Sequence, residues 1–288
     1  MLGRISPPPH AGNVFIVGSQ KNSGKTSTLN AVMASWREHL QKFSLMTTGH
    51  DGEDTDALYS IRKPPVSVQN GDIIVTTAKG LKNTQAELIY PLNTKLASDD
   101  YLGVFLIKNS GTVELFGAPS NDSLWGYIKI LEKFNNIILI DGSFNRWTVT
   151  STSEHYIIIA VSPGTFPTVE ASIMWLKRRL ELLEIKKMTR EDISFEHIDI
   201  NGPLTESVFK DVFEPGKIIN VPSPSHIFLP DNILRKALTV LRVQKKPEIL
   251  GISLNSSSVS GNIISPIDYF SLVSEQFPQY QIADFYGF

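Results

Sequence analysis

Residues 13–26 read NVFIVGSQKNSGKT, an apolar run closed by a glycine and followed by a polar loop that ends in a Lys-Thr pair. The apolar run predicts a short buried strand, and apolar residues at helical spacing over residues 26–41 predict a helix. A loop of this kind places backbone N–H groups at the start of a helix, where an anion is favoured. The stretch therefore predicts an α/β fold with a phosphate site near its N-terminus.

Strand and helix patterns alternate along most of the remaining chain. The run at residues 137–140 (IILI) is apolar without alternation, as buried parallel strands are. Further strands are predicted at residues 43–47, 156–161 and 197–200, and helices at residues 122–134 and 168–185. This alternation predicts a doubly wound, mostly parallel sheet.

Two segments modify this pattern. Residues 64–119 hold β-branched runs separated by turn residues, and predict an inserted, partly antiparallel β segment. After a predicted helix at residues 231–243, the chain closes with a βαβ unit: strand 249–254, helix 266–277 and strand 281–285. We therefore expect one domain over residues 1–245, which carries the 64–119 insertion, and a C-terminal extension over residues 246–288 packed on the same domain.

The composition excludes several classes of function. The chain has 288 residues, with 27 Lys and Arg against 29 Asp and Glu, so no general positive field exists and no nucleic-acid partner is expected. The absence of cysteine excludes disulfides, thiolate nucleophiles and Cys-ligated metals. No apolar run approaches the roughly 18 residues of a membrane span, and residues 1–10 lack the apolar stretch of a secretory signal. No membrane association is expected, and the expected location is cytoplasmic.

The loop at residues 18–26 departs from the Walker A pattern G-x-x-x-x-G-K-[ST] at one position. Gly24, Lys25 and Thr26 match the pattern, whereas the first glycine, Gly18, lies one place early and Ser19 stands in its position. In this motif Lys25 would reach the β and γ phosphates, also acting in catalysis, and the Thr26 hydroxyl would bind magnesium. The predicted nucleotide-binding residues are Ser19, Gln20, Lys21, Asn22, Ser23, Gly24, Lys25, Thr26 and Ser27.

An acid at the end of the strand at residues 137–140 completes the pattern. Asp141 stands where a Walker B carboxylate would hold magnesium through water, beside the Thr26 hydroxyl. An acid that merely caps the turn after a strand is the alternative, and the combination with Lys25 favours the metal site. Thr26 and Asp141 are therefore the predicted magnesium ligands.

A second acidic segment, DGEDTD at residues 51–56, follows the strand predicted at residues 43–47. Phosphoryl transfer depends on alignment of the attacking water and on stabilisation of charge, and P-loop proteins often supply the positioning residue from this place. We therefore expect Asp51, and next Asp54, to act in catalysis. A solvated acidic turn is the alternative.

Two further patterns bear on assembly and on the base. In the deviant Walker A ATPases an additional lysine, five residues before the signature lysine, reaches across a dimer; this chain has Gln20 there and Lys21 one residue later. A lysine acting across a dimer is therefore not expected, and a homodimer stays one possible state. No Asn-Lys-x-Asp guanine motif occurs, so ATP is expected in preference to GTP.

These segments resemble the P-loop group that includes dethiobiotin synthetase and the molybdopterin-guanine dinucleotide accessory protein. The resemblance is carried by the Lys-Asn-Ser-Gly-Lys-Thr loop, by the insertion before a late Asp-Gly strand end at Asp141, and by the alternating units that follow. More narrowly, four stretches resemble the P-loop subunit of the lysine aminomutase reactivase: residues 18–26, 50–53, 140–146 and 255–284.

The resemblance implies a P-loop NTPase that binds ATP and Mg²⁺ and hydrolyses ATP slowly when alone. In that family the subunit works with a second ATPase related to mismatch-repair ATPases, and restores an aminomutase that uses adenosylcobalamin and pyridoxal phosphate. Two alternatives remain open. One is a small-molecule kinase or ligase similar to dethiobiotin synthetase, and the other is a regulatory module that binds nucleotide without turnover.

Overall fold

The computed structural model describes residues 2–38, 42–48, 65–81, 83–96, 99–142, 155–256 and 264–285. The chain forms two compact units. Unit 1 comprises Met1–Phe144, Tyr156–Val169 and Ile249–Phe288, and unit 2 comprises Asn145–His155 and Glu170–Glu248. Within the described ranges, no helix is long and apolar enough to cross a membrane.

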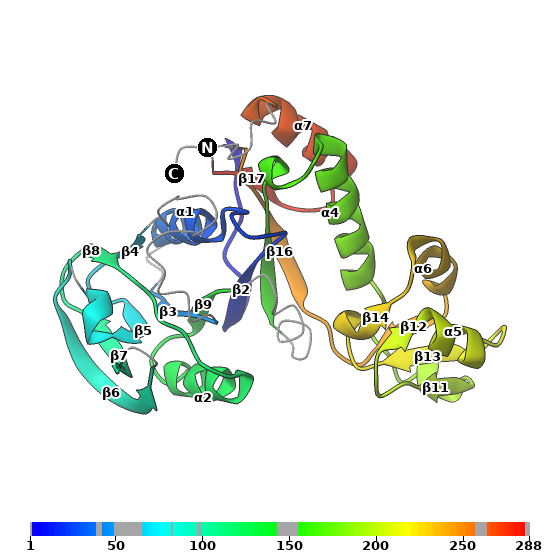
Figure 1. Ribbon diagram of the computed structural model, residues 1–288, viewed down its shortest axis with the longest axis horizontal. Helices are drawn as coiled ribbons and strands as arrows, with labels where there is room; N and C mark the ends of the chain where they lie inside the picture. Colours follow the sequence, from blue (N-terminus) through cyan, green and yellow to red (C-terminus); the bar gives the residue numbers. More distant parts are fainter. Residues whose placement is uncertain are drawn as a thin grey trace. The chain divides into compact units, whose positions relative to one another are not determined.

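Unit 1 is built on a large, mostly parallel sheet, so the predicted α/β class is confirmed (Figure 1). Its strands in the described part of the chain are β1 (Leu2–Gly3), β2 (Gly12–Gly18), β3 (Ser44–Thr47), β5 (Ile73–Thr77), β6 (Ala86–Lys95), β7 (Tyr101–Ile107), β9 (Ile137–Asp141), β10 (Tyr156–Val161), β16 (Glu248–Leu254) and β17 (Ile282–Asp284). They are ordered β1-β17-β16-β10-β2-β9-β3-β5-β7-β6, which puts β2 in the middle.

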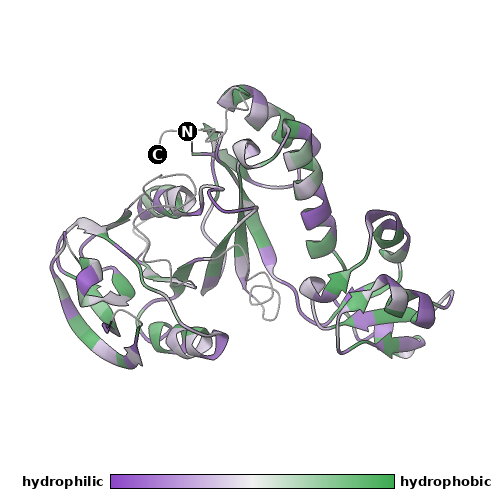
Figure 2. Ribbon diagram, in the orientation of Figure 1, coloured by the Kyte–Doolittle hydropathy of each residue, from purple (hydrophilic) through white to green (hydrophobic). Residues whose placement is uncertain are grey.

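Parallel pairing around β2 forms the centre of this sheet. Val14 of β2 lies between Tyr156 of β10 and Leu139 of β9, and β3 continues the parallel order beyond β9. These strands are apolar without alternation because both faces of a central parallel strand are buried. Figure 2 shows them as hydrophobic segments inside unit 1.

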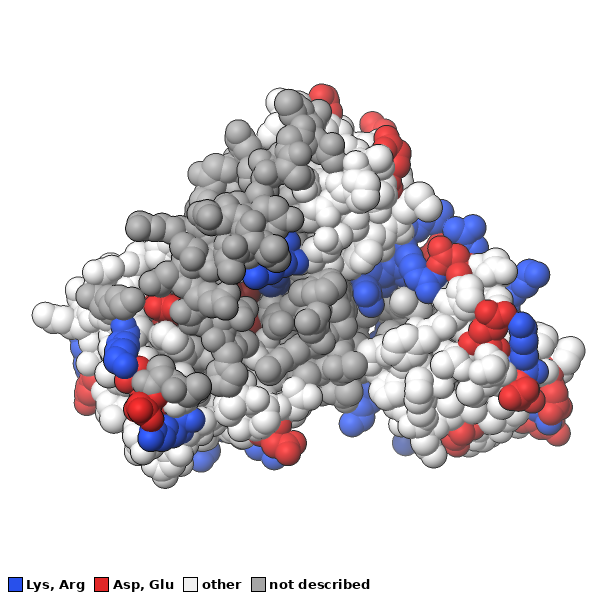
Figure 3. Space-filling view, in the orientation of Figure 1, with Lys and Arg blue, Asp and Glu red and all other residues white. Residues whose placement is uncertain are grey.

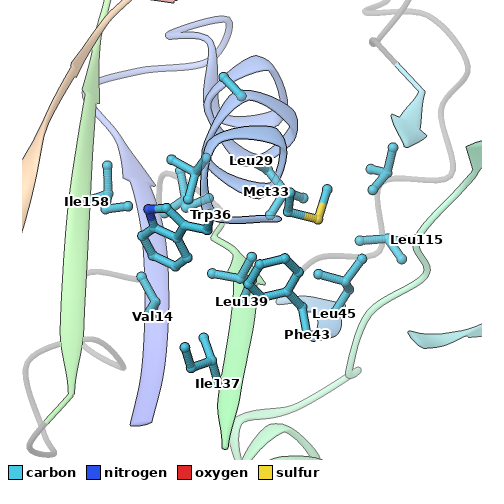
Figure 4. Packing of buried hydrophobic residues seen from close by; sticks show 14 of the residues in the cluster. Val14, Leu29, Met33, Trp36, Phe43, Leu45, Leu115, Ile137, Leu139 and Ile158 are labelled. Carbon is cyan, nitrogen blue, oxygen red and sulfur yellow. The ribbon is translucent and has the colours of Figure 1, made fainter. Parts of the chain in front are cut away.

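Helices cover both faces of the central sheet. Alternate strand residues point to opposite faces. Val14 belongs to the same apolar cluster as Trp36 of α1 (Lys25–Arg37), as Figure 4 shows, whereas Phe15 contacts Trp125 of α2 (Asn121–Leu131) with ring centroids 6.2 Å apart. The amphipathic helices of the sequence therefore bury their apolar faces on the two sides of the β2 region.

The predicted insertion forms the antiparallel edge of the sheet. β7 pairs with both β5 and β6 in antiparallel fashion. A separate antiparallel pair joins β4 (Val66–Val68) to β8 (Gly111–Val113), and the 3₁₀ turn η1 (Ala78–Leu81) follows β5. The β-branched runs with turn residues between them thus correctly predicted a partly antiparallel β segment.

The C-terminal βαβ unit extends the sheet on the other side of β2. β16 and β17 are parallel strands joined through α7 (Pro266–Gln276), and β1 pairs antiparallel with β17. The amide of Asn255, just beyond β16, donates to the Val161 carbonyl at the end of β10, at 2.9 Å. The end of β16 is thereby fixed beside the end of β10.

Unit 2 has its own small parallel sheet and its own core. β11 (His197–Asp199), β13 (Ile218–Val221) and β15 (Leu241–Val243) are parallel, and β12 (Leu204–Thr205) pairs with β14 (Ile227–Phe228). Its helices are α4 (Val169–Leu183, of which Val169 belongs to unit 1), α5 (Glu206–Val212) and α6 (Asp231–Ala237), and its 3₁₀ turns are η4 (Asp192–Ser194) and η5 (Pro224–His226). The 3₁₀ turn η3 (Pro163–Thr165) precedes α4 and belongs to unit 1. The core includes Leu204, Ile219, Val221, Leu234, Leu241 and Val243.

Charge on unit 2 is mixed. Acidic and basic side chains are interspersed over the face drawn in Figure 3. Arg242 and Asp192 form one ion pair of this unit, with 3.0 Å between Nε and Oδ1. Hydrogen bonds from Thr189 and from Arg242 hold the pKa of Asp192 below its ordinary value. This pattern agrees with the nearly balanced charge of the whole sequence.

One expectation about this half of the chain differs from the structure. The helix predicted at residues 231–243 is wrong beyond Ala237, because Leu241–Val243 pairs with β13 and sheet formation outweighs the helical spacing. The two compact units place Glu170–Glu248 in unit 2 and residues 18–26 in unit 1. The domain limits at residues 245 and 246 stay a prediction. Alternating strands and helices look the same in sequence whether they build one sheet or two.

An ion pair with little exposure links the end of α1 to the residue that precedes β5. Arg37, in the last turn of α1, binds Asp72, and the Gln69 amide also donates to that carboxylate at 2.8 Å. The Arg37 guanidinium lies over the Phe43 ring, 5.7 Å from its centroid. Burial raises the pKa of Asp72, and the attraction of Arg37 opposes this rise. The carboxylate therefore depends on Arg37 to stay charged in the folded protein.

We predict that Arg37→Met destabilises the protein by about 3–5 kcal/mol at pH 7, because it leaves a buried carboxylate without its partner. Without Arg37 the pKa of Asp72 rises further above its unfolded value, so the loss is greatest at neutral pH and shrinks as the pH falls through the folded pKa. Denaturant unfolding between pH 5 and 8 measures this. The double variant Arg37→Met/Asp72→Asn should recover most of the loss. A deficit independent of pH would contradict the prediction.

Candidate functional site

The loop of residues 18–26 joins the central strand β2 to α1 at the carboxyl edge of the parallel sheet. The Ser19 amide donates to the Ala160 carbonyl at 2.9 Å, which extends the pairing of β2 with β10 into the loop. Asp141 ends β9 at this same edge, and β16 ends there at Leu254. Ligands of open α/β sheets bind outside the carboxyl ends of the strands, so this edge is the natural position of a site.

Two glycines shape the loop for different reasons. A Cβ atom on Gly18 would lie 2.2 Å from Ser23 Oγ and 3.0 Å from the Lys25 side chain, so the loop folds back onto the end of β2. Gly24 has φ of +86°, and a Cβ atom there would lie 2.4 Å from Asn255 Nδ2. Both positions therefore require glycine. This includes Gly18, which lies one residue before the first glycine position of the Walker A pattern.

The first turn of α1 departs from the usual rules of helix capping. Its N-cap is Gly24, no side chain caps its free N–H groups, and its first residue is the cation Lys25. By contrast, side chains cap α2, α5 and α7, with Ser120, Thr205 and Ser265 as the caps. A helix start that lacks a side-chain cap and carries a lysine is electrostatically suited to an anion.

The Lys25 side chain curls back over the loop. Its Nζ atom donates to the Gln20 carbonyl at 3.3 Å and is partly buried. The ammonium group therefore lies on the loop side of the α1 terminus. A phosphate at this position would meet a positive charge and backbone donors together.

Thr26 and Asp141, which are 115 residues apart in the chain, meet at this edge. Thr26 Oγ1 donates to Asp141 Oδ2 at 3.2 Å. The backbone of Asp141 is held in turn by Thr47 Oγ1 and the Thr48 amide, both of which donate to its carbonyl at 3.0 Å. The structure thus brings together the two residues that the sequence predicted as magnesium ligands.

The oxygen atoms of this pair fit a magnesium ion. With Thr26 bound to magnesium directly and Asp141 through water, the carboxylate would lie beside the Thr26 hydroxyl, as the observed separation of 3.2 Å has it. Across the described residues there is no group of three or more His, Asp or Glu side chains suited to a metal. Magnesium here would need oxygen atoms from phosphate and water besides Thr26 and Asp141, which is its usual coordination in nucleotide sites.

The other predicted loop residues occupy distinct environments. Ser19 and Ser23 are fully buried, and their hydroxyls have no hydrogen-bond partner in the part of the chain that the structure describes. Asn22 adopts a left-handed conformation with φ of 63°, which asparagine tolerates. Lys21 is exposed and Ser27 is half-buried in the first turn of α1. The predicted catalytic acids Asp51 and Asp54 lie outside the described residues.

Three residues contact the loop or its helix without having been predicted as site residues. Thr28 Oγ1 donates to the Gly24 carbonyl at 2.9 Å and lies 2.6 Å from Ser253 Oγ of β16. Asn255, two residues further along, contacts Gly24. Nothing local marks Ser253, which stands between two apolar residues of a strand, because its role depends on a contact across 225 positions.

Comparison with known protein families, with curated proteins and with solved structures found no match to this chain. What the edge of the sheet can bind therefore has to follow from its own residues.

We predict that Gly24→Ala destabilises unit 1 by more than the roughly 1–2 kcal/mol that a left-handed conformation costs an L-residue, because the new methyl group also collides with Asn255. The double variant Gly24→Ala/Asn255→Gly should avoid the collision, so that only the cost of the left-handed conformation remains in its loss of stability. Gly126→Ala is the matched control: Gly126 lies on α2 with open space around it, so the same change should stabilise the protein there by about 1 kcal/mol. Equal denaturant midpoints for Gly24→Ala and the parent protein would contradict the geometry.

Proposed function

We propose that residues 18–26 bind the phosphates of ATP together with Mg²⁺, and that the protein hydrolyses the nucleotide. The observation that carries this proposal is the start of α1, where a helix terminus without a side-chain cap and Lys25 stand beside the Thr26–Asp141 pair. A cation at a helix N-terminus is destabilising by itself, because the helix dipole is positive there. A bound polyphosphate would make it stabilising, because the phosphate charge attracts both the cation and the helix terminus. ATP is preferred over GTP because the sequence has no guanine motif.

Each residue of the site has a separate task in this proposal. The N–H groups at the start of α1 and Lys25 bind phosphate oxygens, and Lys25 stabilises the charge that develops on the transferred group. Thr26 and Asp141 would hold magnesium, which when bound neutralises phosphate charge. Asp51 and Asp54 are proposed to orient the attacking water.

The proposed cellular role is that of a reactivase subunit for an adenosylcobalamin-dependent aminomutase, acting with a second ATPase related to mismatch-repair ATPases. This part rests on the resemblance of residues 18–26, 50–53, 140–146 and 255–284 to the P-loop subunit of the lysine aminomutase reactivase. The position of the 255–284 stretch supports it, because Asn255 contacts Gly24 and the stretch runs through α7 and β17 of the same unit. A slow basal ATPase that responds to partners is expected.

We predict that Lys25→Ala and Asp141→Asn separate binding from hydrolysis. Lys25→Ala should abolish measurable ATP binding, because it removes a charge-assisted contact without touching the core. Asp141→Asn should bind ATP within a few-fold of the parent and lose most magnesium-dependent hydrolysis, since metal positioning is lost. Calorimetric titration and phosphate release measure the two effects.

The controls for this pair are Lys129→Ala and Asp122→Asn, which remove the same charges from exposed positions of α2. Both should behave as the parent protein. Unchanged ATP affinity in Lys25→Ala would refute the phosphate site. Unchanged hydrolysis in Asp141→Asn at saturating magnesium would remove Asp141 from the metal site.

We predict that this protein, its partner ATPase, ATP and magnesium restore a lysine aminomutase that has been inactivated during turnover, once fresh adenosylcobalamin is added. Recovery should require ATP and disappear with Lys25→Ala. A small-molecule kinase or ligase would instead couple hydrolysis to a metabolite without any partner, and a regulatory module would bind ATP without releasing phosphate. No recovery with a folded, ATP-bound protein would refute the reactivase role.

A further inference from the structure

The end of β16 makes a buried polar contact with the helix that begins at the phosphate loop. Thr28 lies in the first turn of α1, and its Oγ1 atom is 2.6 Å from Ser253 Oγ. Both side chains are almost completely buried, at 1% exposure each. This contact is shorter than the one of 3.2 Å that joins Thr26 of the same helix to Asp141.

The direction of this hydrogen bond follows from proton counting. A threonine hydroxyl has one proton, and Thr28 Oγ1 donates it to the Gly24 carbonyl at 2.9 Å. The bond between the hydroxyls must therefore use the proton of Ser253, with Thr28 as acceptor. A chain of hydrogen bonds thus runs from Ser253 through Thr28 to the Gly24 carbonyl.

The Gly24 carbonyl controls one of the phosphate-binding groups. It also accepts from the Thr28 amide at 2.8 Å, so two bonds from Thr28 hold it toward the helix. In a trans peptide the carbonyl and the following N–H point in opposite directions, and no cis bond occurs among the described residues. Holding the Gly24 carbonyl toward Thr28 therefore turns the Lys25 N–H away from the helix, to the side where the loop lies.

Asn255 reinforces this arrangement from the same strand end. Residues two apart on a strand point to the same side, so Ser253 and Asn255 both face the start of α1. The Asn255 amide is anchored on the Val161 carbonyl, and its side chain packs so closely on Gly24 that no Cβ atom fits there. The Gly24–Lys25 peptide is thus held by Thr28 on one side and by Asn255 on another.

We propose that Ser253 is a positioning residue for the phosphate loop: through Thr28 it fixes the Gly24–Lys25 peptide, so that the Lys25 N–H faces the phosphates of a bound nucleoside triphosphate. The inference rests on the proposed function. It makes β16, which follows the loop by more than 200 residues, a determinant of phosphate affinity. Ser253 touches no nucleotide in this role, so its loss weakens binding and leaves the chemical step intact.

The test measures the ATP affinity and the rate at saturating ATP for Ser253→Ala, Thr28→Val and the double variant. Loss of one net hydrogen bond predicts an affinity about fivefold weaker for Ser253→Ala, with kcat within twofold of the parent. Thr28→Val removes the whole chain and should weaken binding at least as much. Because both residues act through one chain, the double variant should bind no more weakly than Thr28→Val alone.

Controls separate positioning from general destabilisation. Ser44→Ala removes an equally buried serine that accepts a bond from Asn135 at the beginning of β3, and should leave ATP affinity unchanged. Ser253→Thr keeps the hydroxyl and should restore affinity. In ¹⁵N spectra of the nucleotide-free protein, Ser253→Ala should shift the Lys25 amide and Ser44→Ala should not. Thr28→Val breaks the same chain of hydrogen bonds at its α1 member. If Ser253→Ala does not fold, the ATP affinity of Thr28→Val therefore tests the proposal.

The outcomes that overturn the inference differ from those that overturn the proposed function. Parent-like affinity in Ser253→Ala, with binding still abolished in Lys25→Ala, refutes the positioning role and leaves the phosphate site standing. A fall in kcat without a change in affinity also refutes it. If the parent protein binds neither ATP nor inorganic pyrophosphate, the proposed function fails and the inference fails with it.

Discussion

Ile16 of β2 lies opposite Asp141 of β9, and the candidate site depends on this register. It lets the Asp141 carboxylate emerge beside the first turn of α1, 3.2 Å from the Thr26 hydroxyl. A shift of one residue between the strands would turn the carboxylate to the other face of the sheet. The apolar side chains of both strands prevent such a shift, because it would bring a charge into the core. The chemistry of the edge is thus a consequence of packing deep inside the sheet.

The start of α1 is locally less stable than a capped helix start, and its residues are those suited to an anion. A glycine N-cap without a side-chain bond forgoes a contribution of roughly a few tenths of a kcal/mol, and a lysine in the first turn opposes the helix dipole. The helix is stable all the same, since Leu29, Met33 and Trp36 are fully buried against the sheet. Core packing therefore permits a helix start that local propensity disfavours. Breaches of local rules at one place in an otherwise regular fold are typical of functional sites.

Much of unit 1 was predictable from the sequence because its signals are local. Apolar runs without alternation mark β2, β9 and β10, and the loop between β2 and α1 has a nearly complete motif. The meeting of Thr26 with Asp141 followed from that motif. The boundary of unit 2 and the end of α6 at Ala237 did not, because they depend on which strands pair, and pairing is decided by tertiary contacts. Ser253 escaped for the same reason, since only the folded sheet brings it to Thr28.

The candidate site is therefore a property of the completed sheet and not of the loop alone. Its groups come from residues 18–28, from the end of β9 and from the end of β16, and no short segment contains two of these three parts. A ligand that binds only the assembled edge stabilises everything needed to form it, by about 2.7 kcal/mol at a concentration one hundred times its Kd. For the proposed nucleotide, that stabilisation would extend through β16 to α7 and β17, which pair and pack with the same sheet. Binding at the loop and order in the C-terminal βαβ unit would then be linked reciprocally, as any two equilibria that share one folded state must be.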